Sequence, residues 1–153
     1  MTSLQKIYTH LCKANKKKIW IDDIHNKCLN FNPDINKSLY FFNNNNNIIK
    51  IRNKCNHIFI YNCYNSNFYI HDCVSGITFI NCKNCNILIN RIPRYTIEIK
   101  SSKVIIRCHG FAVPILFHDS EILLIKQLNY VVQEYIQIIT NLFQGWGYNY
   151  FNF

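Results

Sequence analysis

The chain has 153 residues, of which 49% are hydrophobic and 16% charged, a composition that fits one domain with a sizeable apolar core. No stretch approaches the roughly 18 apolar residues that a membrane span needs, and residues 1–18 lack the apolar segment of a secretory signal. With 17 Lys and Arg against 8 Asp and Glu, the formal charge of +9 favours an acidic partner.

Residues 1–18 form a basic lead-in with four lysines, Lys13, Lys16, Lys17 and Lys18. Within it, residues 4–11 have a mildly helical pattern. Residues 18–24 predict a strand that enters the first turn of the coil.

Residues 19–127 carry a strong repeat. Isoleucines recur there at intervals of nine or ten residues, each at the end of a short alternating run, at Ile51, Ile60, Ile70, Ile80, Ile89 and Ile99. Residues two apart on a strand face the same side, so each run offers two apolar side chains to one wall. One strand and one tight corner fit this period, and two or three such units would complete one turn of a coil. The pattern predicts an all-β fold, a right-handed parallel β-helix (β-solenoid).

An antiparallel sandwich also places strands every eight to twelve residues. It would normally use Asn-Gly or Asp-Gly hairpin turns, which are absent, and Gly76 is the only glycine in the periodic region. The solenoid is therefore the favoured interpretation.

Asn and Cys recur between the runs at similar phases, as Asn62-Cys63, Asp72-Cys73 and Asn81-Cys82. Stacked corners would align them in ladders, with buried reduced thiols as structural residues. Residues 82–85 form the only CxxC pattern and have no partner pair, so neither a metal site nor a cofactor is expected. The asparagine run at residues 43–47 is interpreted as a tolerated insertion at a corner.

Basic side chains cluster around the coil and predict a partner-binding surface. Lys50 lies between two inward isoleucines and must therefore point outward. The sequence has no nucleic-acid-binding signature, no P-loop and no catalytic constellation, so we expect a binding protein without enzymatic activity. The predicted surface consists of Lys50, Arg52, Lys54, Arg91, Arg94, Lys100, Lys103 and Arg107.

Residues 128–153 break the repeat. Residues 130–139 are a long β-prone run, and residues 143–153 are rich in aromatic side chains, which are rarely left in water. We expect a β-arm or hairpin extension that caps the coil, pairs with a second copy as an exchanged strand, or docks on a partner, and we favour the first two. The candidate dimerisation residues are Tyr130, Val132, Tyr135, Ile136, Ile138 and Trp146.

Several segments resemble the C-terminal β-helix of the cyclase-associated proteins, the C-CAP domain, over residues 20–139. They are Trp20, Lys-Cys-Asn-His-Ile-Phe-Ile-Tyr-Asn-Cys at residues 54–63, residues 80–83, Ile92-Pro93 with residues 96–99, and Ser120-Glu121. The resemblance implies a cytoplasmic, cytoskeleton-associated protein that binds monomeric actin and promotes its nucleotide exchange and turnover. It also implies a homodimer that exchanges C-terminal strands, and a single-domain form such as some protozoan parasites carry.

The sister family of tubulin cofactor C offers an alternative. Residues 81–85, Asn-Cys-Lys-Asn-Cys, are similar to that family's corners, which would make tubulin or a small GTPase the partner. Arg94 would then act as an arginine finger that stimulates GTP hydrolysis. The two glutamines that precede this arginine in the family are missing here, which favours the actin interpretation.

Overall fold

The computed structural model describes residues 17–91, 93–108, 112–128, 133–140 and 146–152. Every regular element in these ranges is a strand, and they contain no helix long and apolar enough to cross a membrane. The strands are β1 (Lys18–Asp22), β2 (Cys28–Phe31), β3 (Ser38–Phe42), β4 (Ile48–Tyr61), β5 (Asn67–Ile80), β6 (Lys83–Ile89), β7 (Thr96–Lys100), β8 (Lys103–Cys108), β9 (Ala112–His118), β10 (Glu121–Leu128), β11 (Gln133–Thr140) and β12 (Trp146–Asn152).

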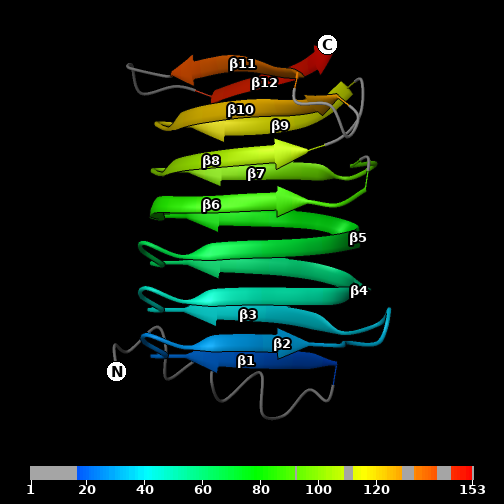
Figure 1. Ribbon diagram of the computed structural model, residues 1–153, viewed down its shortest axis with the longest axis vertical. Coiled ribbons are helices and arrows are strands. Elements are labelled where there is room, and N and C mark those ends of the chain that lie inside the picture. The colour runs from blue at the N-terminus through cyan, green and yellow to red at the C-terminus, as the bar shows by residue number, and fades with distance from the viewer. Residues whose placement is uncertain (1–16, 92, 109–111, 129–132, 141–145, 153) are drawn as a thin grey trace.

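The strands wind into a β-solenoid with two strands in each turn and two parallel faces (Figure 1). β4 and β5 are long because each bends through a corner and contributes one half to each face. The first face contains β1, β3, the C-terminal halves of β4 and β5, β7 and β9. The second face contains β2, the N-terminal halves of β4 and β5, β6, β8 and β10. The predicted parallel β-solenoid is thus confirmed.

The core lies between the two faces and is built from in-register columns of apolar side chains. Ile49, Phe68 and Ile87 are successive partners on the second face, and all three are buried. Stacking buries each apolar wall against the next turn, which no turn can achieve alone.

The repeat of nine or ten residues is half a turn. Five of the six isoleucines are buried in the core as predicted. Ile80 is the exception, because Phe79 takes the inward position between Ile60 and Ile99, and alternation then directs Ile80 outward.

Asparagines shape the tight corners that follow the first-face strands. Asn43, Asn62 and Asn81 have φ between 52° and 55°, and Asn46, Asn65 and Asn84 repeat this left-handed conformation three residues later. Asparagine tolerates this conformation better than other residues with a side chain, glycine aside. The side chains also form the predicted ladder, since Asn81 Nδ2 donates to Asn62 Oδ1 at 2.9 Å and Asn84 Nδ2 to Asn65 Oδ1 at 2.7 Å.

Two predictions about the corners were wrong. Residues 43–47 are not an insertion, because they form a corner of the same length as residues 62–66 and are hydrogen-bonded to it. Asp72-Cys73 does not share the phase of the asparagine corners. It lies on the opposite side of the coil, where Cys73 Sγ is 3.7 Å from Cys55 Sγ.

The C-terminal strands close the last turn. β11 pairs antiparallel with β10, and β12 pairs antiparallel with β9, so a hairpin extension is present as predicted. Tyr135, Ile136 and Ile138 lie in β11, and Trp146 begins β12. Tyr130 and Val132 fall outside the described residues, as do residues 1–16 of the lead-in, and the division into lead-in, coil and arm stays a prediction.

Candidate partner-binding face

The outward side of the second face, called the basic face below, carries in-register columns of solvent-directed side chains. Lys50 pairs with Tyr69, Tyr69 with Leu88, and Leu88 with Arg107. Because the neighbours Ile49 and Ile51 are buried in the core, Lys50 points outward as the sequence predicted.

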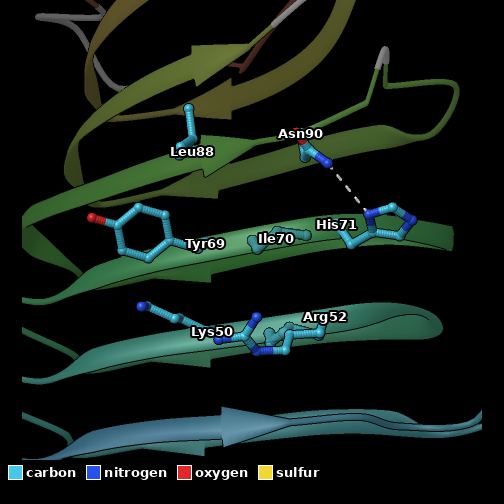
Figure 2. Close-up of a pocket in the computed structure, with 8 residues that line it drawn as sticks. Lys50, Arg52, Tyr69, Ile70, His71, Leu88 and Asn90 are labelled. Carbon is cyan, nitrogen blue, oxygen red and sulfur yellow. Dashed lines mark hydrogen bonds between the residues drawn. The ribbon is translucent and has the colours of Figure 1, made fainter.

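A hollow of about 500 Å³, called the basic hollow, lies on this face (Figure 2). Its outward lining comes from three neighbouring strands: Lys50 and Arg52 on β4, Tyr69 and His71 on β5, and Leu88 and Asn90 on and just after β6. Backbone alternation within each strand therefore sets which side chains reach the hollow.

Weak contacts with neutral groups hold the cations of the basic hollow in place. Lys50 Nζ lies 5.8 Å from the centroid of the Tyr69 ring. Arg52 donates from Nε and Nη2 to Asn30 Oδ1 at 3.3 and 3.2 Å, and Asn90 Nδ2 is 3.5 Å from His71 Nδ1. None of the described residues that line the hollow is acidic, so its positive potential is available to an incoming anion.

The eight predicted cations do not form one surface. Lys50, Arg52, Lys103 and Arg107 lie on strands of the basic face. Four others lie elsewhere: Lys54 forms an ion pair with Asp72 at 3.6 Å on the far corner, Arg91 and Arg94 are exposed in the β6–β7 connection, and Lys100 belongs to the first face. The eight cations are thus divided between two faces and two connections of the coil, and their role in binding a partner stays a prediction.

Sequence reasoning missed an aromatic cluster on the outward side of the first face. Phe42 is only 1% exposed although it points away from the core, because rings around it cover it. Trp20 stacks on Phe42 at 4.1 Å between centroids, and Phe59 and Tyr61 approach it at 5.6 and 5.4 Å. The sequence does indicate this cluster, because aromatic residues stand two apart at the outward positions of β3 (Tyr40 and Phe42) and β4 (Phe59 and Tyr61). A solvated sheet face normally carries polar side chains at such positions.

The buried cysteines are structural. Cys63 and Cys82 Sγ donate to backbone carbonyls of their own corner at 3.5 Å, and the described residues include no group of three or more metal-ligating side chains. Burial raises the pKa of Cys82, and hydrogen bonding with Cys82 together with burial raises the pKa of Cys85. Both thiols stay protonated at neutral pH and are poor nucleophiles.

Comparisons with known proteins agree with this architecture. The family model described as "Adenylate cyclase associated (CAP) C terminal" matches residues 10–106. A crystal structure of cyclase-associated protein from Cryptosporidium parvum superposes with a TM-score of 0.77 at 19% sequence identity, covering 88% of this chain and 91% of that one. A search of curated proteins found no match. Since the family model covers more than half of the chain, this protein belongs to the family of cyclase-associated protein C-terminal domains.

Proposed function

We propose that this chain binds monomeric actin through its basic face and regulates actin nucleotide exchange and turnover without catalysing a reaction itself. The observation that carries the proposal is a hollow lined by Lys50 and Arg52, with no acidic side chain among its described lining residues, on a sheet face of a cyclase-associated protein domain. Actin is acidic, so the sign of the charge suits electrostatic steering.

The mechanism would be differential binding. A partner that prefers one nucleotide state of actin, or an open nucleotide cleft, shifts that equilibrium by the difference between its affinities for the two states. A solenoid face suits this role because each strand is fixed by hydrogen bonds to both neighbouring turns. The face can therefore present its cations without a large ordering cost on binding.

Two further properties belong to the proposal. β11 and β12 are the strands that we propose to be exchanged between two copies, which would make the protein a homodimer. We also propose that it acts in the cytoplasm, in association with the cytoskeleton.

Pyrene-actin assays with monomeric actin provide the test. At ~10 µM protein, a concentration suited to micromolar affinity, we expect faster nucleotide release or slowed polymerisation. Arg52→Glu should weaken the effect about five- to tenfold, whereas Lys18→Glu, on β1 of the opposite first face, should leave it nearly unchanged. No effect of the unmodified protein would refute the proposal. Stimulation of GTP hydrolysis that is lost on Arg94→Ala would instead support the tubulin-cofactor role.

A further inference from the structure

Three hollows lie side by side on the basic face. The basic hollow spans β4, β5 and β6, and a second hollow of about 310 Å³ shares Tyr69 and Leu88 with it. A third, also about 310 Å³, adjoins across β8 and β10, where Ile105 and Leu123 line it. Together they run obliquely over the stack, from β4 to β10.

The chemistry of the lining changes along this line. At the β4 end, Lys50 and Arg52 provide full positive charges, and the described residues that line this hollow include no acid to offset them. At the β10 end, Ile105 and Leu123 are half-buried, and the two charges present, Lys103 and Glu121, pair with each other at 3.8 Å. One end of the line is therefore cationic, and the other is apolar and electrically neutral.

Its dimensions suit a short peptide segment. From β4 to β10 the face crosses four inter-strand spacings, about 19 Å, which equals about six residues of extended chain. Side chains of an extended peptide alternate, so three of six would point towards the sheet, one for each hollow. The first two hollows are separate spaces that share Tyr69 and Leu88 in their linings, whereas a helix of about 10 Å diameter would need one wider groove.

We propose that the basic face binds an extended partner segment of about six residues, with acidic side chains at its β4 end and apolar side chains at its β10 end. This inference rests on the proposed function, because it names the chemistry of the actin segment that would dock there. A simple phosphate anion would satisfy Lys50 and Arg52 but would leave the apolar hollow at Ile105 and Leu123 unused. The exposed side chains of Ile48 (41%) and Tyr69 (40%) lie on the same face and would add apolar contact area.

Nuclear magnetic resonance titration of the full, isotope-labelled chain with synthetic hexapeptides tests the proposal. The probe is Leu-Ser-Leu-Ser-Glu-Glu, the charge control is Leu-Ser-Leu-Ser-Gln-Gln, and the apolar control is Ser-Ser-Ser-Ser-Glu-Glu. We expect the probe to shift backbone amide signals of β4, β5, β6, β8 and β10 on the basic face. Each control peptide should bind at least about fivefold more weakly, since it retains only one of the two chemistries.

Two variants assign the ends of the segment. Arg52→Gln should weaken binding of the probe at least about fivefold and should hardly change binding of the Gln-Gln control peptide. Leu123→Ser should weaken binding of the probe but not of the apolar control peptide Ser-Ser-Ser-Ser-Glu-Glu. Lys18→Gln, on the first face, serves as the matched control for lost charge, and unchanged amide spectra away from the substituted residue would show that each variant is folded.

The outcomes separate this inference from the proposed function. Equal binding of all three peptides, shifts on the first face, or the same shifts with acetate alone would overturn the peptide proposal. If the pyrene-actin effect persists in that case, the proposed function stands and only the docking chemistry is wrong. If the probe binds as expected but actin does not respond, the site is real and its partner is a different acidic protein.

Discussion

Replacing Asn47 with alanine should destabilise the solenoid strongly, although Asn47 belongs to a run of five asparagines. Asn47 is 1% exposed, and its side chain bridges to the preceding turn. Its Oδ1 accepts from Lys27 N at 2.8 Å, and its Nδ2 donates to Ile24 O at 2.8 Å. Alanine would leave both backbone groups without these partners.

The magnitude follows from those two bonds. Leaving one buried polar group unsatisfied costs about 1–3 kcal/mol, and the lower half of that range applies because Lys27 and Ile24 are partly accessible. Two such losses amount to about 3 kcal/mol. For a domain of this length, that corresponds to a fall in Tm of about 6–12 °C.

Asn45 provides the matched control. It is exposed in the same corner, and its Oδ1 only accepts from Asn65 Nδ2 at 3.3 Å on the surface. Asn45→Ala should change the free energy of unfolding by about 0.5 kcal/mol or less. Urea unfolding followed by circular dichroism measures both variants, and equal losses for Asn47→Ala and Asn45→Ala would refute the view that the corner is a hydrogen-bonded ladder.

Three other predictions concern the backbone, a histidine and the arm. Gly76→Ala should cost about 2–4 kcal/mol, because φ is +146° and an added Cβ would lie 2.6 Å from Thr96 O; a thermal melt within about 1 °C of the unmodified chain would contradict this. Burial lowers the pKa of His57 from its ordinary value of 6.5, so the unfolded chain gains a proton first as pH falls, and stability should decrease below about pH 6.5 by up to about 1.4 kcal/mol per pH unit. His57→Gln should reduce the difference in urea midpoint between pH 7.5 and pH 5.5, and an unaltered difference would assign the effect to other groups. Removing residues 130–153 should convert the proposed dimer into a monomer or an aggregating chain, because β9 and β10 lose their antiparallel partners; an unchanged elution volume in size-exclusion chromatography would rule out strand exchange.

The fold could be predicted because a solenoid repeats the same physical requirement in every turn. An inward position must be apolar in each layer, so Ile51, Ile70 and Ile89 reveal the stack before any contact is known. The corners add a second signal, since a left-handed residue without glycine favours asparagine. Phe79 points into the core instead of the expected Ile80, because both residues are apolar and the sequence alone does not show which of the two faces inward.

The asparagine run shows where composition misleads. Its five residues have identical side chains, yet Asn44 and Asn47 are buried and hydrogen-bonded to the preceding turn, whereas Asn45 and Asn46 are exposed. Only the register with the next corner distinguishes them. The residue of the next corner that corresponds to Asn44 is Cys63, whose Sγ also donates to backbone carbonyls. Aligning the two corners in the sequence could therefore have identified Asn44 as a buried structural residue.

The assignment of cations to faces needed one quantity that the sequence left open, the number of strands in a turn. With two strands per turn, successive runs alternate between the faces, so Lys50 and Lys100, which lie an odd number of runs apart, must fall on opposite faces. With three strands per turn they would have been arranged differently. The β4 and β5 pairing settles this point and divides the predicted surface.

The two outward faces differ in what they still offer to a partner. On the first face, the rings of Trp20, Phe59 and Tyr61 already cover Phe42, so much of the apolar area there is buried within the chain itself. On the basic face, the contacts of Lys50 and Arg52 within the described part of the chain are with the neutral groups Tyr69 and Asn30, so a carboxylate that approached them would not have to displace a described acidic side chain. Binding is favourable only if the contacts formed with the partner are stronger than those that the free surfaces already make. The basic face has more to gain from a partner by this criterion, and for this reason we propose that the partner binds there rather than on the aromatic cluster.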